Sequence, residues 1–299
     1  MRKFSNFSAS EWLRLLPLKH ALKQVRNDAW LVLYKRFRPK ALAPFLKEME
    51  RYRDRNIALV VAFEQPWALD WLLRMAERNL TDTAVLVFDN SRRVAARLEI
   101  ERVCRERGVP YLLLPANPTR HANRSHGMAM TWIFHNVVRA IQPRLFAFVD
   151  HDMIPVQKID LSERLSEQPF FGFTYASTWA WHLWAGYCLY DFSAVSRLPL
   201  NFLYDFSQNL DTGARNWRCL YKNHRLNLLR QAESALVAVT DPVTGISHQV
   251  QMVDQRWLHI GSISYNDNFS SKSQMCEHLA LALDQGQSWS AMVAQGTPT

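Results

Sequence analysis

Apolar residues follow two different spacings along the chain, and the change occurs near residue 55. Before that point, Ser8-Ala9-Ser10-Glu11 has the form of a capping box, and apolar residues at helical spacing follow it, interrupted by Pro17. This pattern predicts one or two amphipathic helices. The apolar positions are Trp12, Leu15, Leu16, Leu22, Val25, Ala29, Val32 and Leu33.

After residue 55, short apolar runs of strand length alternate with helical stretches. The predicted strands cover 57–63, 84–88, 111–114 and 145–149. The predicted helices cover 66–77, a stretch through Arg107 that Gly108 closes, and 125–140. This alternation indicates an α/β fold, a mostly parallel sheet with helices on both faces. Beyond Phe170 the pattern weakens and aromatic residues crowd together.

The two spacings divide the chain into three expected parts. Residues 1–55 form a basic amphipathic helical segment, 56–274 an α/β domain, and 275–299 a C-terminal helix with a polar tail. The composition of the 299 residues, 48% apolar and 21% charged, is that of an ordinary soluble globular protein. The longest apolar runs are too short to span a bilayer.

Compartment and partners follow from the cysteines and the charge. Four cysteines stand far apart with no paired spacing, and the first residues lack the apolar core of a secretory signal, so we expect a cytoplasmic location. Residues 1–55 hold 14 Lys and Arg against 5 Asp and Glu, whereas the remaining residues hold 22 of each sign. All of the net charge therefore lies in the N-terminal segment.

The basic segment has two interpretations. One is attachment to an anionic membrane surface, to which each basic residue adds about 1 kcal/mol. The other is a helix packed on the rest of the protein with a solvated basic face. Trp30 and Tyr34 suit either interpretation. No nucleic-acid recognition motif accompanies the charge, so no nucleic-acid partner is expected.

Asp150-His151-Asp152 is the most informative stretch for chemistry. It directly follows the apolar strand 145–149, and Pro155 ends any regular element soon after it. In an open α/β sheet, ligands bind at the carboxyl ends of strands. Two carboxylates at such a place suit a divalent cation that leaves some positions for substrate phosphates. The alternative is a pair of solvated carboxylates that end a strand.

With these elements in this order, residues 56 to about 265 resemble the GT-A-type glycosyltransferases related to family 2. The resemblance implies a Rossmann-like nucleotide-binding half joined to an acceptor-binding half. It implies that the Asp-x-Asp holds Mn²⁺ or Mg²⁺ against the diphosphate of a UDP- or GDP-sugar. Asp152 would then be the more direct metal ligand, and Asp150 would contact ribose or metal. The acceptor would be a glycan or a lipid-linked glycan.

The same resemblance places nucleotide contacts at the ends of the first two strands. Phe63 and Glu64 correspond to the family's first nucleotide-contacting loop, and Asp89 to the acidic residue that meets the base or ribose. The alternative for Asp89 is a helix N-cap, which is also our interpretation of Asn90 and Ser91.

Asn123, Arg124 and His126 resemble the segment that opens the helix before the Asp-x-Asp strand. Exposed amides at a helix N-terminus favour an anion, and Arg124 or His126 would contact the diphosphate. His126 is equally well explained as a structural hydrogen-bonding residue. In Trp179–Gly186, where the family contacts the sugars, Trp184 and Gly186 are the preferred candidates, and at least one tryptophan is expected in the core.

Asp211 is the candidate catalytic base, because inverting relatives take a carboxylate from this region to deprotonate the acceptor hydroxyl. Asp211-Thr212-Gly213 also predicts the start of a helix through Tyr221, with Asp211 as its cap. The usual Glu-Asp pair of family 2 is absent, so the base and the stereochemistry stay open, with Asp191 and Asp205 as competitors.

His259, in the run 257–262, stands where several GT-A enzymes place a late histidine on the metal. A histidine buried in a strand is the alternative. A sugar-phosphate nucleotidyltransferase is disfavoured, because Glu64-Gln65-Pro66-Trp67 after the first strand contains no glycine. A membrane-associated scaffold that kept the fold without the chemistry is the non-enzymatic alternative.

Overall fold

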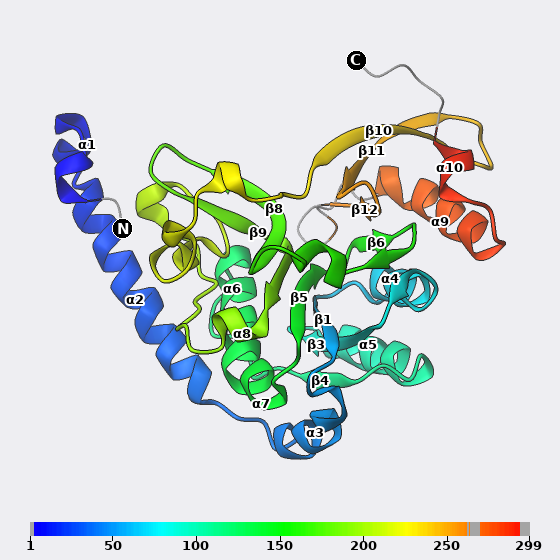
Figure 1. The fold of residues 1–299 in the computed structure, drawn as a ribbon, viewed down its shortest axis with the longest axis horizontal. Coiled ribbons are helices and arrows are strands. Elements are labelled where there is room, and N and C mark those ends of the chain that lie inside the picture. The colour runs from blue at the N-terminus through cyan, green and yellow to red at the C-terminus, as the bar shows by residue number, and fades with distance from the viewer. Residues whose placement is uncertain (1–2, 262, 264–269, 294–299) are drawn as a thin grey trace.

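A six-stranded sheet forms the centre of the computed structural model, which describes residues 3–261, 263 and 270–293 (Figure 1). Its order is β4-β3-β1-β5-β9-β8, in which the first four strands pair in parallel and β9 pairs antiparallel with both β5 and β8. The bounds are β1 Asn56–Ala62, β3 Thr83–Asp89, β4 Tyr111–Leu113, β5 Leu145–Asp150, β8 Phe170–Ala176 and β9 Trp181–Asp191. The predicted α/β class with a mainly parallel sheet is therefore confirmed.

Helices cover both faces of this sheet, because its central strands are apolar on both sides. In β1, Ala58 and Val60 pack in one core with the helices α4 and α5, and Ile57 and Leu59 pack in a second core with α3 and α6. The helices are α3 Leu42–Met49, α4 Pro66–Asn79, α5 Val94–Glu106, α6 Ala122–Ile133, and α7 Arg139–Ile141, which follows a π-helical turn η3 at Phe134–Val138.

A second, antiparallel sheet packs beside the first and joins distant parts of the chain. Its order is β10-β11-β12-β6, and the pairing of β12 with β6 sets His259 opposite Met153. The bounds are β6 Met153–Pro155, β10 Ser234–Thr240, β11 Ser247–Val253 and β12 Trp257–His259. The helices α9 Ser270–Asp284 and α10 Trp289–Met292 lie against this sheet, and β2 Leu80–Thr81 pairs with β7 Ile159–Asp160.

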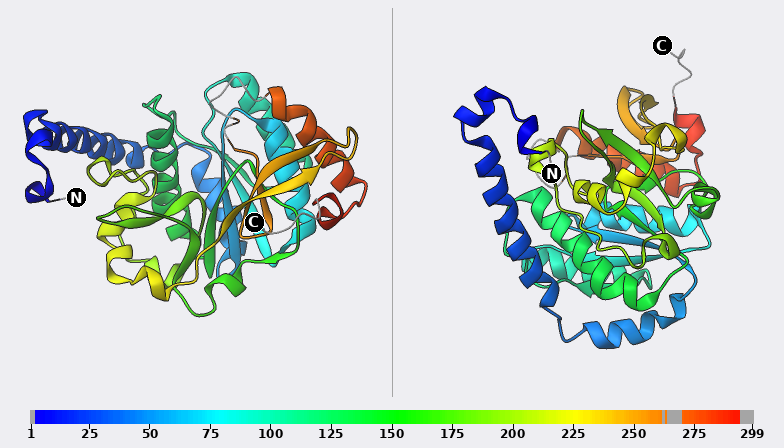
Figure 2. Two further views of the ribbon diagram at one scale, coloured as in Figure 1. Left: turned by 90° about the horizontal axis from the view of Figure 1, so that it is seen from above. Right: turned by 60° about the vertical axis from the view of Figure 1, so that its left-hand side comes forward.

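The N-terminal segment forms helices, and the longest of them runs along the outside of the molecule (Figure 2). Ser8 and Glu11 form the predicted capping box at the start of α1 Ala9–Leu13. Pro17 lies in the first turn of α2 Leu16–Arg36, where a proline costs no hydrogen bond, so it begins the helix rather than interrupting it. Among the described residues, no helix is both long and apolar enough to cross a bilayer.

Three local predictions were wrong. The helix expected from Asp211 does not form, because Gly213 has a φ of +95°, outside the range of a right-handed helix. Residues 214–223 instead form two 3₁₀ turns, η6 Ala214–Arg218 and η7 Tyr221–Asn223. Asp211 therefore caps no helix. Asn90 and Ser91 do not cap α5, which begins after Arg93.

The C-terminal helix α9 begins at Ser270, earlier than expected, while Ser262 and the last residues of the expected tail, 294–299, lie outside the described residues. The boundaries after 55 and 274 stay predictions. The remaining short elements are η1 Phe4–Asn6, η2 Glu50–Tyr52, η4 Ser162–Leu165, α8 Phe192–Val195, η5 Phe206–Gln208 and η8 Leu226–Leu228.

Candidate active site

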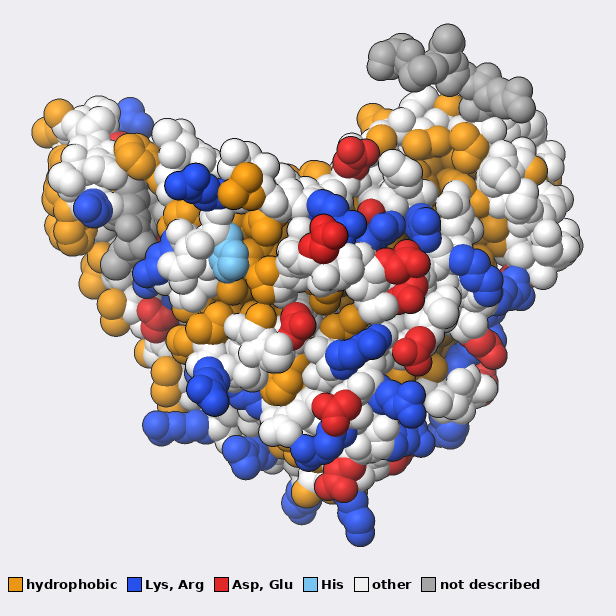
Figure 3. All heavy atoms as spheres, in the orientation of Figure 1, with side chains coloured by type: hydrophobic (Ala, Val, Ile, Leu, Met, Phe, Trp, Pro, Cys, Tyr) orange, Lys and Arg blue, Asp and Glu red, His pale blue; other side chains and the backbone are white. Residues whose placement is uncertain are grey.

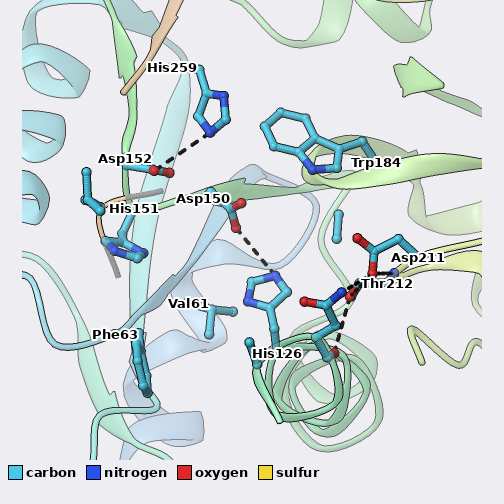
Figure 4. Close-up of a pocket in the computed structure, with 14 residues that line it drawn as sticks. Val61, Phe63, His126, Asp150, His151, Asp152, Trp184, Asp211, Thr212 and His259 are labelled. Carbon is cyan, nitrogen blue, oxygen red and sulfur yellow. Dashed lines mark hydrogen bonds and ion pairs between the residues drawn. The ribbon is translucent and has the colours of Figure 1, made fainter. Parts of the chain in front are cut away.

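A pocket of about 160 Å³ opens where the carboxyl ends of β1 and β5 meet the start of α6 (Figure 4). β9 and the end of β12 close its other sides. It is the switch-point position at which open α/β sheets bind ligands. The lining residues are Val61, Phe63, Ala122, Asn123, His126, Asp150, His151, Asp152, Trp184, Ala185, Asp211, Thr212, His259 and Ile263.

Asp150 is the last residue of β5, and its carboxylate points at α6. His126 Nε2 lies 3.4 Å from Asp150 Oδ1. Burial, and after it the neighbouring Asp152 carboxylate, raises the pKa of Asp150. Burial also lowers the pKa of His126 to about 4, which favours the neutral imidazole. Two carboxylates so close together are a place where added positive charge is favourable.

Gly186 makes room for this arrangement. A Cβ at Gly186 would lie 2.4 Å from Cζ2 of Trp184 and 2.6 Å from Oδ2 of Asp150. The absence of a side chain therefore lets the indole ring and the carboxylate share one side of the pocket. Trp184 in turn packs edge-on against His259, with ring centroids 4.9 Å apart.

His259 faces Asp152 through its Nε2. This atom lies 3.7 Å from Asp152 Oδ2, and Nδ1 lies 2.7 Å from Oε1 of Gln251. The Nε2 of the Gln251 amide donates to Ser234 Oγ at 2.8 Å. An amide oxygen only accepts hydrogen bonds, so with the amide in this placement the proton of a neutral ring lies on Nδ1. A lone pair on Nε2 and a carboxylate then point toward each other.

That geometry fits a cation. Metal-binding histidines donate their other N–H to a carbonyl or carboxylate, as His259 does here. Two carboxylates and an imidazole suit Mn²⁺ or Mg²⁺ with further oxygen ligands. Within the described ranges, no group of three His, Cys, Asp or Glu side chains is arranged to hold a metal ion by itself. A cation beside Asp152 and His259 would need further oxygen ligands from outside the protein.

Asp211 reaches the pocket from the opposite side. Asn123 Nδ2 donates to its Oδ1 at 2.5 Å, and the backbone N–H of Thr212 donates to the same oxygen at 2.7 Å. No hydrogen bond from a described residue goes to Oδ2. The structure brings Asp211 together with Asp150, Asp152, His126 and His259 around one space.

The two competing aspartates lie elsewhere. Asp191, at the far end of β9, accepts hydrogen bonds from Ser193 and Ala194 and caps α8. Asp205 is 1% exposed and accepts a hydrogen bond from the backbone of Ser207 in η5. Neither lines the pocket.

Four other candidates also lie outside the lining, namely Gly186, described above, and Glu64, Asp89 and Arg124. The Glu64 carboxylate accepts hydrogen bonds from the backbone of Arg92 and Arg93 and pairs with the Arg93 side chain. Asp89 is fully buried and accepts from Ser91 N at 2.8 Å and from a tyrosine hydroxyl at 3.0 Å. Arg124 follows Asn123 on α6 without lining the pocket.

Asp89 lines a second cavity at the carboxyl ends of β3 and β4, together with Arg92, Arg97 and Arg120. The hydrogen bond that Asp89 accepts from Ser91 N closes a turn and does not cap a helix. Among the three crowded tryptophans, Trp181 packs in the core against Trp217 and Trp179 is 45% exposed, so the expectation of a core member holds.

Sequence reasoning missed several residues of the site, among them Gln251, His151 and Thr212. A signal existed for Gln251. The strands on either side of residues 254–256 form a hairpin whose register pairs Val253 with Trp257 and thus Gln251 with His259. Recognition of the hairpin would have set the amide opposite the histidine.

No family model and no curated protein sequence match this chain. Solved glycosyltransferase structures do match it. One is a mannosyltransferase from Pyrobaculum calidifontis in complex with GDP-Man and Mn²⁺, at 10% identity and a TM-score of 0.34, with 60% of this chain and 56% of that chain covered. A second is the bifunctional glycosyltransferase WbbM, at 11% identity and a TM-score of 0.31, with 46% and 32% covered.

A third is glucosyl-3-phosphoglycerate synthase from Mycobacterium tuberculosis in complex with Mn²⁺ and UDP-Glc, at 17% identity and a TM-score of 0.25, with 38% and 39% covered. This chain therefore matches between about a third and just over half of these structures. At such TM-scores the likenesses carry no argument about activity, which rests on the pocket itself.

Proposed function

We propose that this protein is a metal-dependent glycosyltransferase, which moves a sugar from a UDP- or GDP-sugar to a hydroxyl acceptor. The observation that carries the proposal is the His259–Asp152 pair, with Gln251 against the other ring nitrogen, in the pocket that also holds Asp150 and Asp211. A lone pair facing a carboxylate is stabilised by a cation, and the cation's remaining ligands suit a diphosphate.

Asp152, His259 and Asp150 would hold Mn²⁺ or Mg²⁺. When bound, such a cation stabilises the negative charge that develops on a leaving nucleoside diphosphate. The side chains around it bind and orient the donor. Trp184 offers a flat face to the sugar, and the start of α6, with His126 and Arg124, lies where a diphosphate gains from helix amides.

The nucleoside would lie along the carboxyl ends of β1 and β3. Phe63 lines the main pocket and Asp89 the second cavity, so we assign both residues to the nucleoside. The Glu64 carboxylate would hold the backbone that follows Asp89 in place. The main pocket, at about 160 Å³, suits the reacting end of the donor rather than all of it.

Asp211 is the proposed general base. Its Oδ2 would take the proton of the acceptor hydroxyl, while Asn123 and Thr212 hold Oδ1 in place. The acceptor oxygen forms a bond to the anomeric carbon, and the bond from that carbon to the diphosphate oxygen breaks. Nucleoside diphosphate leaves with the electron pair. A cytoplasmic glycan or lipid-linked glycan, as in the building of a surface polysaccharide, is the proposed acceptor.

Isothermal titration of UDP and then GDP, with and without Mn²⁺, tests the donor site. Wild type is expected to bind one of them in a metal-dependent manner, and Asp152→Asn to weaken that binding by at least tenfold. Glu101→Gln, the same chemical change on the exposed side of α5, is the matched control. If nucleotide affinity is the same with and without Mn²⁺ and is unchanged in Asp152→Asn, the metal-dependent site is refuted. Metal-dependent binding without transfer to any glycan acceptor would instead favour the scaffold alternative.

A further inference from the structure

The outward side of α2 carries a row of apolar side chains that face solvent. The row, which we call the α2 stripe, consists of Leu18, Leu22, Val25, Ala29 and Val32. Alternating steps of three and four residues set these positions on one side of a helix. Leu22 is 71% exposed and Val25 is 68% exposed. Figure 3 shows hydrophobic atoms along the outer edge of this helix.

The inward side of α2 combines apolar and polar contacts. Leu31 and Tyr34 pack in the hydrophobic core. Asn27 is fully buried and donates to a tyrosine hydroxyl at 3.2 Å, and Asp28 pairs with Arg215, whose side chain is 3% exposed. These contacts attach the helix to the protein. The stripe takes no part in them, and the residues that the structure describes leave it uncovered.

The charge beside the stripe is of one sign. Lys19, Lys23 and Arg26 follow one another at helical spacing along one flank, and Trp30, 43% exposed, continues the same flank. The acidic residues of α1 and α2 are Glu11, which belongs to the capping box, and Asp28, which pairs with Arg215. The exposed part of α2 is therefore apolar and basic, with a tryptophan at the boundary between the two.

We propose that the α2 stripe docks on an anionic lipid surface. An apolar helix face with a basic flank and a boundary tryptophan lies in the headgroup region of such a surface, where both kinds of side chain are satisfied. A second copy of the helix fits less well, because pairing of two stripes brings two basic flanks together. This proposal goes beyond the proposed transfer reaction and does not depend on it.

Vesicle flotation of the full chain tests the proposal, with vesicles of phosphatidylcholine alone and of phosphatidylcholine mixed with phosphatidylglycerol. Wild type is expected to bind the anionic vesicles at least tenfold more tightly. Leu18→Gln/Leu22→Gln/Val25→Gln is expected to lose that binding. The matched control replaces three exposed leucines elsewhere, Leu98, Leu228 and Leu236, with glutamine and is expected to bind as wild type does.

A charge series separates the two parts of the surface. Each basic residue near an anionic surface strengthens binding by about fivefold, so Lys19→Gln/Arg26→Gln is expected to weaken it by more than tenfold. Lys47→Gln/Lys222→Gln is the control. All exchanged side chains are exposed, so circular dichroism should show the wild-type fold.

The proposal would be overturned if wild type does not bind vesicles, if it binds both vesicle types equally, or if Leu18→Gln/Leu22→Gln/Val25→Gln binds as wild type does. If wild type forms a dimer by light scattering that only this stripe variant abolishes, and does not bind vesicles, the stripe would be assigned to a second copy instead. Mn²⁺-dependent UDP or GDP binding should be the same in all variants, so a failure here is distinguishable from a failure of the transferase proposal.

Discussion

Gln251 determines which nitrogen of His259 carries the proton, so its replacement should change the chemistry of the site without replacing any residue that lines the pocket. In Gln251→Leu the side chain keeps its approximate shape but offers no acceptor to Nδ1. The imidazole proton can then move to Nε2, which faces the Asp152 carboxylate 3.7 Å away. A proton on Nε2 takes the place of the lone pair that would bind a cation.

The expected loss is 10- to 100-fold in Mn²⁺ affinity, or about 1.4 to 2.7 kcal/mol, the usual effect of removing such an orienting partner. The free energy of unfolding should fall by only about 1 to 2 kcal/mol, because two partly exposed hydrogen bonds are lost. Mn²⁺ titration in the presence of UDP or GDP, followed by electron paramagnetic resonance, measures the first quantity, and urea denaturation the second.

Gln249→Leu is the control for this experiment, since Gln249 lies two residues away on the same face of β11 and is exposed. It should leave Mn²⁺ affinity unchanged. If Gln251→Leu binds Mn²⁺ as tightly as wild type does, the tautomer argument is wrong, and the His259–Asp152 pair is a structural contact only.

Three further outcomes follow from the described contacts. Gly186→Ala should lower metal-dependent nucleotide binding more than tenfold, because the new methyl group would sit 2.4 Å from the neighbouring indole ring, and unchanged binding would contradict the packing argument. Asp211→Asn should lower the transfer rate by 10²- to 10⁴-fold while nucleotide affinity by titration stays the same, and a loss of affinity instead would assign Asp211 to donor binding. Burial alone would raise the pKa of Asp241, but hydrogen bonds from His278 and the following turn lower it to about 2, below its ordinary value of 3.8. The stabilisation from Asp241 is therefore complete above about pH 4 and is lost as the pH falls toward 2. Urea denaturation between pH 5 and pH 3 should show a steeper loss of stability in wild type than in His278→Ala, and equal slopes would refute this assignment.

Local patterns were sufficient for the central sheet and the aspartates at its edge. The apolar run before Asp150 is buried on both faces, so the run itself identifies a buried strand. The place of this strand in the sheet follows from the parallel order of its neighbours. The position of Asp150 and Asp152 at the carboxyl edge follows directly from that.

Contacts between distant segments could not be predicted in the same way. The bond between Asn123 and Asp211 depends on where an irregular loop returns to α6, and neither residue carries a local sign of the other. The helix expected after Asp211 failed for a related reason, because Gly213 has a positive φ where the loop passes β9, and a Cβ there would lie 3.0 Å from the carbonyl oxygen of Leu183. Gln251 was missed because the hairpin that holds it was not recognised.

The pairing of β12 with β6 has a consequence for the order in which the site forms. Asp150 ends a strand that pairs with β1 earlier in the chain, and Asp152 follows it directly, whereas His259 arrives through a pairing of β12 with Met153 from much later in the chain. The first pairing lies wholly upstream of the second, so it becomes available earlier as the chain is synthesised. During synthesis the carboxylate pair would thus exist before its histidine, and affinity for the cation would develop only once the last third of the chain has folded.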